Sequence, residues 1–209
     1  MANRRRYGGL LIAAGSVFLA AALFLAVYNF LDSRRAGSVS EQVLEELQDR
    51  AGNDALPGTS APETGALPDY VTNPDMAMPT VEIDGNSYIG VLEIPSLELS
   101  LPVMSEWSYP NLRISPCRYG GSAYAGNLVI AAHNYSRHFG RLSTLEPGGK
   151  VVFTDVDGNT FYYRVAETGV IEPTAIEDVL GGDWALTLFT CTYGGQARVA
   201  VRCVSSGPE

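Results

Sequence analysis

The stretch that decides the fold is TLFTCTYGGQAR, Thr187 to Arg198, in the C-terminal part of the 209-residue chain. Gly194 and Gly195 separate two alternating runs, which is the pattern of a β-hairpin with a two-residue turn. With that turn, Thr192 pairs with Ala197, and the next pair outward is Cys191 with Arg198. The hairpin therefore predicts that a thiol and a guanidinium are cross-strand neighbours.

The same pairing sorts the two strands of the hairpin by face, because side chains alternate along a strand. One face carries a mainly apolar set: Leu186, Leu188, Thr190, Val199, Val201 and Cys203. The other face carries Thr187, Phe189, Cys191, Arg198, Ala200 and Arg202. Arginines are seldom fully buried, so we expect the first face to line the core and the second to open on water or a groove. Cys203 is then a buried filler, whereas Cys191 is placed for chemistry.

A thiol beside a fixed positive charge is suited to nucleophilic catalysis, because the cation favours the reactive thiolate. Arginine stays protonated and can also donate hydrogen bonds to an oxyanion. Such chemistry needs a base or ion-pair partner as well, and the chain has two histidines. His133 ends the apolar run GNLVIAAH, where its side chain can reach a groove, and it is the predicted partner. His138 lies in the polar segment NYSRHFGRL, where we expect a solvated or helix-capping imidazole.

The N-terminal stretch from Tyr7 to Leu31 carries no charge and is long enough to cross a bilayer core as a helix. Arginines flank it on both sides, and the better orientation keeps the short N-terminus in the cytoplasm and exports the C-terminal part. A cleaved signal peptide is the alternative, but its apolar region usually runs about 7–15 residues. We therefore predict an uncleaved, single-pass membrane anchor.

Three regions are expected: an N-terminus and anchor over 1–35, a short helix and linker over 36–80, and a β-rich domain over 81–209. Ser38 and Glu41 form a capping-box pattern that predicts a new helix there, with an apolar stripe of Val43, Leu44 and Leu47. Prolines then recur between Ala51 and Thr80, which is typical of an extended linker.

From Val81 the pattern changes to short apolar or alternating runs separated by turn residues, as in a β-barrel or sandwich. Asp157 and Gly158 mark a hairpin turn. Short helical or 3₁₀ segments are expected in HFGRLSTL and TAIEDVLGG. The seven strand candidates are 87–95, 97–104, 127–132, 150–156, 160–170, 185–193 and 197–204.

Composition argues against several classes of protein. The formal net charge is −9, whereas proteins that bind nucleic acid present basic surfaces, so no nucleic-acid partner is expected. Three cysteines are too few for a domain stabilised mainly by disulfides. Cys117, in the Gly-rich segment ISPCRYGG, is interpreted as an inert small residue in a loop, with a regulatory thiol as the alternative.

The segment TLFTC resembles the TLxTC strand motif of the sortases, the cysteine transpeptidases of Gram-positive bacteria. As in that family, a histidine ends an earlier strand, here NLVIAAH, and an arginine lies on the strand that follows the cysteine. The order His133, Cys191, Arg198, the N-terminal anchor and the β-rich domain agree with this resemblance, which covers Val81 to Val204.

The resemblance implies a mostly β, eight-stranded sortase barrel that cuts an LPxTG-like sorting signal between Thr and Gly. Cys191 would attack the Thr carbonyl, Arg198 would hold the peptide and the oxyanion, and His133 would protonate the leaving amine. The implied acceptor is an amine of the peptidoglycan cross-bridge or of lipid II, or a pilin lysine, and no metal or organic cofactor is required. The expected substrate-binding residues are Thr190, Ala132 and Asn134.

Several departures bear on the subclass. Ala132 stands where sortases usually carry glycine before the catalytic histidine, which keeps a small residue there. The ten residues between TGVIEP and WALTLFTC are too few for the long class B helix, and no DPW-type lid is evident. Cell-wall anchoring is therefore favoured over pilin polymerisation. Some class A sortases bind calcium, for which Glu172, Glu177 and Asp178 are candidates, although a solvated acidic loop is the preferred interpretation.

Two other functions remain as alternatives: a membrane-anchored cysteine peptidase that only hydrolyses its substrate, and a non-catalytic β-barrel adhesin or scaffold. The linker also contains LPGTS (Leu56 to Ser60) and APETG (Ala61 to Gly65), each one residue away from LPxTG. Pro-rich linkers produce such strings by chance, so coincidence is favoured over a tethered pseudo-substrate.

Overall fold

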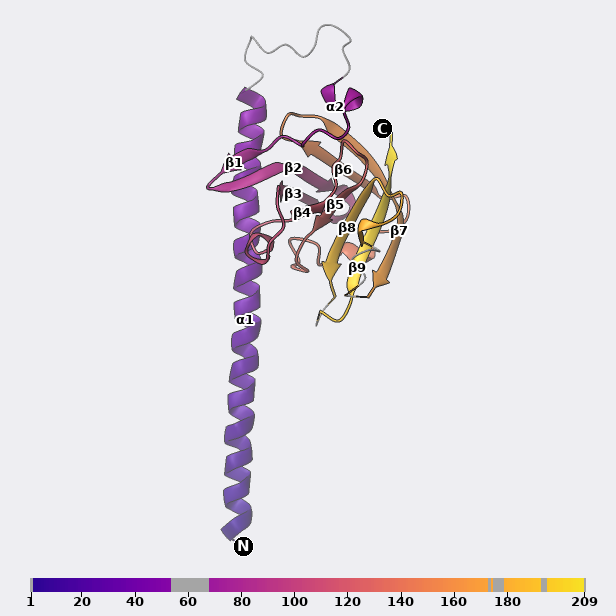
Figure 1. Ribbon diagram of the computed structural model, residues 1–209. Helices are drawn as coiled ribbons and strands as arrows, with labels where there is room; N and C mark the ends of the chain where they lie inside the picture. Colours follow the sequence, from indigo (N-terminus) through magenta and orange to yellow (C-terminus); the bar gives the residue numbers. More distant parts are fainter. Residues whose placement is uncertain (1, 54–67, 173, 175–178, 193–194, 209) are drawn as a thin grey trace. The chain divides into compact units, whose positions relative to one another are not determined.

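Figure 1 shows the computed structural model of the chain, which describes residues 2–53, 68–172, 174, 179–192 and 195–208. By its contacts the chain divides into two compact units, Met1–Arg35 and Ala36–Glu209. The helical elements are α1 (Ala2–Asn53), α2 (Asp69–Thr72), η1 (Pro95–Leu97), α3 (Tyr109–Leu112) and η2 (Leu142–Thr144). The strands are β1 (Val81–Ile83), β2 (Asn86–Ile94), β3 (Leu99–Met104), β4 (Cys117–Gly120), β5 (Leu128–Ala131), β6 (Lys150–Asp155), β7 (Thr160–Ile171), β8 (Leu186–Cys191) and β9 (Arg198–Ser206).

The first unit holds the N-terminal part of α1. Its stretch Ile12–Asn29, with a mean hydropathy of 1.9, is long and apolar enough to cross a membrane. Large apolar side chains such as Phe18 and Leu19 are exposed there, as in helices that face lipid. The helix α1 continues through Ser38, so the prediction of a new helix beginning at that residue is wrong. Gly37 is the weakest helix former nearby, and its penalty of about 1 kcal/mol does not interrupt the helix.

The second unit is built around a closed sheet with the order β1-β2-β3-β4-β5-β8-β9-β7-β6, in which β2 also pairs with β6. The pairing of β2 with β6 closes β2 to β9 into an eight-stranded barrel, which confirms the predicted fold class. The strand β1 lies outside this ring and pairs with the beginning of β2. Two contacts are parallel, β3 with β4 and β5 with β8, and the others are antiparallel.

Gly90 allows the barrel to close. The register of β2 against β3 shifts between Tyr88 and Gly90, and Gly90 has a φ of 154°. A Cβ atom at this position would lie 2.1 Å from the backbone oxygen of Thr154 on β6. Only glycine therefore lets β2 leave β1 and approach β6 at this point.

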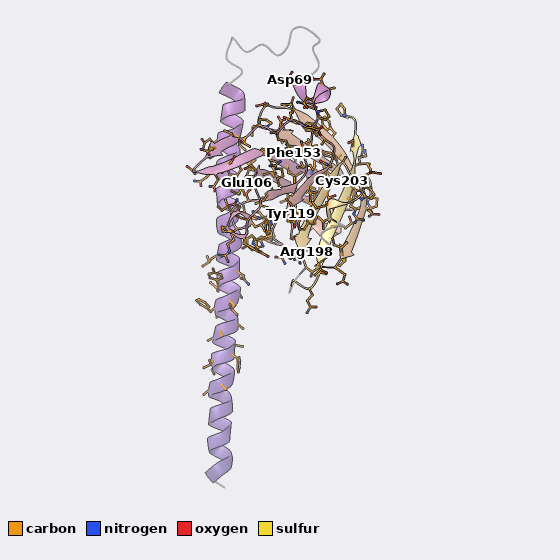
Figure 2. The ribbon with its side chains drawn as sticks, in the orientation of Figure 1. Asp69, Glu106, Tyr119, Phe153, Arg198 and Cys203 are labelled. Carbon is orange, nitrogen blue, oxygen red and sulfur yellow. The ribbon has the colours of Figure 1, made fainter. Side chains whose placement is uncertain are left out.

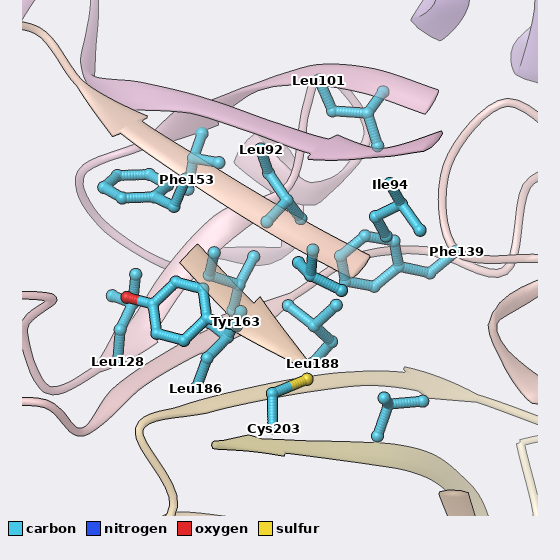
Figure 3. Close-up of a cluster of buried hydrophobic side chains, with 14 of the residues drawn as sticks. Leu92, Ile94, Leu101, Leu128, Phe139, Phe153, Tyr163, Leu186, Leu188 and Cys203 are labelled. Atoms are coloured by element: carbon cyan, nitrogen blue, oxygen red, sulfur yellow. The ribbon is translucent and has the colours of Figure 1, made fainter. Parts of the chain in front are cut away.

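The interior of the barrel holds the main hydrophobic core (Figure 3). The predicted core face of the β8–β9 hairpin is buried as expected: Leu186, Leu188, Thr190, Val199, Val201 and Cys203. Figure 3 shows the sulfur of Cys203 beside Leu188 within this cluster. Burial raises the pKa of the Cys203 thiol to about 12, so this residue acts as an apolar filler.

All seven strand candidates are present, and two strands were not predicted. β1 has only three residues, and β4 lies in ISPCRYGG, which was expected to be a loop. That expectation is wrong, because Cys117 pairs with Ala131 of β5 and with Met104 of β3. Cys117 is fully buried, and burial raises the pKa of its thiol to about 12. Burial thus disfavours the reactive thiolate of Cys117, in agreement with its interpretation as an inert residue.

A second hydrophobic cluster lies apart from the main core and includes Tyr88, Met104, Leu112, Cys117 and Ala131. Val43 and Leu47, two of the three residues of the predicted apolar stripe, are buried and belong to the same cluster. Met78 was expected in the linker, but it is buried in the main core.

Several expectations lie wholly or partly outside the described residues. These are the linker strings LPGTS and APETG, residues 175–178 of the TAIEDVLGG segment, and the turn residues Tyr193 and Gly194. The hairpin turn between β6 and β7 is described, and Gly158 has the positive φ of 86° that its position requires.

Candidate active site

Three neighbouring strands bring Cys191, Arg198 and His133 to one end of the barrel. Cys191 of β8 pairs with Arg198 of β9, as the hairpin register predicted. The strand β5 runs parallel to β8 on its other side, with Ala131 opposite Phe189. The strand β5 ends at Ala131, and His133, two residues beyond it, lines the same groove as Cys191. Figure 2 shows Arg198 at this end of the barrel, and Figure 1 shows that β9 begins there.

The three residues line one groove of about 200 Å³, named here the aromatic groove. The backbone N–H of Ala132 donates to the carbonyl oxygen of Phe189 at 3.1 Å, which extends the β5–β8 contact to the groove. The described lining residues are Trp107, Tyr109, Leu112, Tyr119, Ala131, Ala132, His133, Glu172, Val179, Phe189, Thr190, Cys191 and Arg198. The structure thus brings together all three predicted catalytic residues and two of the predicted substrate-binding residues.

Asn134, the third predicted substrate-binding residue, lines a different cavity of about 190 Å³. This cavity shares Thr190 and Cys191 with the aromatic groove. The remaining described residues of its lining are Asn134, Phe139, Gly140, Ser143, Thr192 and Val199. Cys191 therefore belongs to the lining of both spaces.

The aromatic wall of the groove was not predicted from the sequence. The ring of Tyr119 makes edge-on contacts with Trp107 and Phe189, at centroid distances of 5.5 and 5.1 Å. Trp107 also contacts Tyr109 at 5.2 Å. Aromatic pairs of this geometry stabilise one another and present an apolar surface. In the sequence, the only hint of this aromatic wall was the cluster EWSYP. Its packing against β8 depends on the tertiary fold, so the sequence alone did not reveal the wall.

The outer face of the β8–β9 hairpin is only partly open, which corrects the expectation that it faces water or a groove throughout. Thr187 and Ala200 are buried, and Phe189 is half-buried against Tyr119. Arg202 is half-buried as well, where it forms an ion pair with Glu167. The groove is thus confined to the end of the hairpin that carries Cys191 and Arg198.

The guanidinium of Arg198 lies beside the β8–β9 turn. Its Nη1 donates to the carbonyl oxygens of Ala197 at 3.2 Å and Gly195 at 3.4 Å. Both contacts are long for hydrogen bonds, so a better acceptor would compete for these donors. The side chain is half-buried, which leaves donors available to a group in the groove.

The segment that follows β5 folds into a compact turn that fixes the backbone of His133. The N–H of Phe139 donates to the carbonyl oxygen of His133 at 3.1 Å, and that of Gly140 to the carbonyl oxygen of Tyr135 at 2.9 Å. A Cβ atom on Gly140 would lie 2.7 Å from two backbone oxygens, so the turn requires glycine. The ring of Tyr135 lies 4.8 Å from that of His133 and 5.6 Å from that of His138.

His138 was expected to be solvated or helix-capping, and this expectation is wrong. The side chain is fully buried beside Phe139, which packs into the main core. Burial, and secondarily the nearby His133, lower the pKa of His138 to about 4. The imidazole is therefore neutral at physiological pH.

Acid is expected to weaken the fold through His138. Its pKa is about 4 in the folded chain and about 6.5 when unfolded, so the unfolded state binds the extra proton between these values. Stability is full above pH 6.5 and falls as the pH drops toward 4, by roughly 2–3 kcal/mol at pH 4.5. Urea unfolding of the detergent-solubilised chain, followed by tryptophan fluorescence, measures this loss. On the same acidification, His138→Leu should lose less free energy of unfolding than the wild type, and the difference should equal the loss attributed to His138. Equal losses in the variant and the wild type would contradict the prediction.

Metal ligands are not evident among the residues that the structure describes. No group of three or more His, Cys, Asp or Glu side chains gathers there in a metal-binding arrangement. Glu172 is exposed at the aromatic groove, whereas Glu177 and Asp178 lie outside the described residues. The calcium hypothesis and the expectation of no cofactor both stay predictions.

The chain matches a known protein family. A family model described as a sortase domain matches residues 92–206, which is more than half of the chain. The chain belongs to the sortase family. The match spans the strands that carry His133, Cys191 and Arg198, and it confirms the resemblance noted in the sequence.

Individual relatives agree with this assignment. Sortase A of Bacillus anthracis is 31% identical over 132 residues, which cover 58% of this chain and 60% of the relative. This sortase therefore spans about 60% of the length of that curated relative. The crystal structure of sortase C1 from Streptococcus suis is 27% identical, with a TM-score of 0.51, over 58% of this chain and 74% of that one.

A Clostridium perfringens sortase D5 transpeptidase has a TM-score of 0.58 with 19% identity and covers 81% of this chain and 99% of that one. At this identity the likeness concerns the fold alone. The similar proteins include sortases named A, C and D, so the comparisons leave the subclass of this sortase open.

Proposed function

We propose that this sortase is a membrane-anchored cysteine transpeptidase that cleaves an LPxTG-like sorting signal and joins the released protein to a cell-wall amine. The observation that supports this best is the pairing of Cys191 with Arg198 at the end of a groove that His133 also lines. A nucleophile, a fixed donor for an oxyanion and a proton carrier are thereby within one site.

The reaction follows from these three side chains. The Cys191 thiolate attacks the carbonyl carbon of the substrate Thr, and the N–H groups of Arg198 donate to the oxyanion that forms. Protonated His133 gives its proton to the departing amine, which leaves a thioester on Cys191. An acceptor amine then attacks the thioester, His133 takes a proton from it, and the thiolate departs as a new amide bond forms.

The aromatic groove suits the apolar part of such a peptide. Trp107, Tyr119 and Phe189 form one wall, and the small residues Ala131 and Ala132 leave room beside them. Aromatic surfaces hold apolar and proline-containing segments by burial of area. Thr190, a proposed substrate-binding residue, lies beside Cys191 in the same lining.

The apolar helix of the first unit supports the location. Residues Ile12–Asn29 have the length and composition of a membrane span. An anchor with a cytoplasmic N-terminus would hold the catalytic domain outside the cell, beside proteins that carry sorting signals and the amines of the cross-bridge or lipid II.

A peptide-library experiment tests this function. The full chain in detergent is incubated with LPxTG-like peptides, with and without amine acceptors, and the products are identified by mass spectrometry. Cleavage after Thr with a ligated product is expected when an amine is present. If the peptide is only hydrolysed even when an amine is present, the result would support a plain cysteine peptidase instead. If no peptide of the library is cleaved, the result would contradict the proposal.

A further inference from the structure

The part of α1 that belongs to the second unit has one buried face. Ser40, Val43 and Leu47 are buried, whereas Glu41 and Glu45 are exposed. Spacings of three and four residues place the buried side chains on the same face of the helix. The helix therefore packs against the domain with this face, which is named here the docking face.

The docking face shares a hydrophobic cluster with the wall of the aromatic groove. Its two apolar residues belong to the second hydrophobic cluster together with Leu112 and Ala131. Leu112 and Ala131 also line the groove. Tyr119 and Phe189, two rings of the aromatic wall, pack against the same cluster. The cluster therefore connects the helix with the surface on which a peptide would lie.

We propose that the docking face positions the wall of the aromatic groove, so that binding of the sorting peptide depends on the docked helix. The inference rests on the proposed function, because it concerns how that peptide is held. A groove binds more tightly when its wall already has the bound shape, since ordering side chains on binding costs free energy. Close packing of a side chain by its neighbours maintains that shape. Val43 and Leu47 are therefore positioning residues that act through Leu112 and Ala131.

A second contact joins the helix to the turn that fixes His133. Nη1 of Arg137 lies 2.5 Å from Oε1 of Glu41. Arg137 belongs to the turn in which the N–H of Phe139 donates to the carbonyl oxygen of His133. Both side chains of the ion pair are exposed, so solvent screens their attraction. The buried apolar residues of the docking face are therefore the ones to test.

The residues that carry out the proposed chemistry are held by other contacts. Cys191 and Arg198 pair within the β8–β9 hairpin, whose core face packs in the main core. Loss of a contact in the second cluster should thus weaken peptide binding more than the chemical step. An equal loss of binding in the ground state and the transition state raises KM and leaves kcat unchanged.

The first test truncates the docking face in the full chain in detergent and measures KM and kcat for a peptide that the library selects. Leu47→Ala is expected to raise KM about tenfold and to change kcat by less than about twofold. Leu47→Met keeps most of the apolar volume and should have a KM near the wild-type value. Val43→Ala removes fewer atoms from the same cluster, so it takes the place of Leu47→Ala if that variant does not fold.

Two variants control for a general loss of stability. Leu44→Ala makes the same truncation on the same helix, at a half-buried position outside the two described clusters. Val151→Ala shortens a fully buried side chain of β6 in the main core, outside the described lining of the groove. Both should keep the wild-type KM, although Val151→Ala lowers the melting temperature. A KM that rises as much in either control as in Leu47→Ala would overturn the inference.

Hydrogen exchange reports on the groove wall without any peptide. In the turn that carries α3, the N–H groups of Leu112 and Ser115 donate to the carbonyl oxygens of Ser108 and Asn111, at 3.0 Å each. Leu47→Ala should speed the exchange of these two amides about tenfold, because the turn opens more often when its cluster is depleted. Wild-type exchange, or a wild-type KM, in folded Leu47→Ala would overturn the inference. Wild-type enzyme that cleaves no peptide would refute the proposed function, whereas the exchange rates would still decide whether the helix positions the wall.

Discussion

Replacing Cys191 with alanine is expected to abolish peptide cleavage and ligation, with a loss on the order of 10⁴-fold or more in kcat/KM. The alanine side chain cannot form the thioester, and neither Arg198 nor His133 can substitute for a nucleophile. The measurement is turnover of an LPxTG-like peptide by the full chain, together with a search by intact mass for the acyl adduct. The adduct should appear on the wild type alone.

Cys203→Ala is the matched control for this variant. It removes another thiol from the same hairpin, but one that is fully buried on the core face opposite Leu186. We expect Cys203→Ala to lower stability by about 1 kcal/mol and to keep wild-type turnover at temperatures where it is folded. Activity of Cys191→Ala within tenfold of the wild type would remove the basis for a cysteine enzyme.

Arg198→Ala is expected to lower kcat/KM about 10²–10³-fold, the usual effect of removing one donor to an oxyanion. The two hydrogen bonds from Arg198 go to carbonyl oxygens of its own turn, so little stability should be lost. Arg198→Lys should recover part of the activity, because the charge remains while the planar pair of donors is lost. Steady-state kinetics on the library-selected peptide gives both values.

Arg202→Ala provides the comparison for Arg198, since it removes the same side chain from the same face of β9. Its guanidinium is bound to Glu167 at 2.6 Å and lies 5.7 Å from the ring centre of Trp184, and it does not line the aromatic groove. Turnover should therefore stay near the wild-type value, although thermal stability falls. Equal losses of activity in the two variants would show that arginines on this face act through stability alone.

The hairpin was predictable because all of its information is local. The double glycine and the alternation around it are sufficient to determine the pairing of Cys191 with Arg198 and the burial of Cys203, and the structure has both. The placement of His133 was predictable only as the end of an apolar run. Its place in the same groove as Cys191 depends on the parallel contact of β5 with β8, which joins segments far apart in the sequence.

Other features depended on contacts that no local pattern reveals. His138 stands among polar residues, yet the turn that follows His133 carries it inward together with Phe139. The wall of the aromatic groove combines Trp107 and Tyr119 with Phe189, which had been placed on a face open to water or a groove without its aromatic partners. The helix α1 passes through a capping-box pattern, because continued backbone hydrogen bonding outweighs a local cap.

The sheet order also has a temporal consequence. The strand β9 lies between β8 and β7, so the ring stays open until the residues of β9 have joined it. During synthesis, a nascent chain presents His133 first, then Cys191, and Arg198 only with that final strand. Pairings between distant segments also form late in folding. A chain made only as far as β8 therefore carries Cys191 without the arginine that pairs with it in the finished sheet.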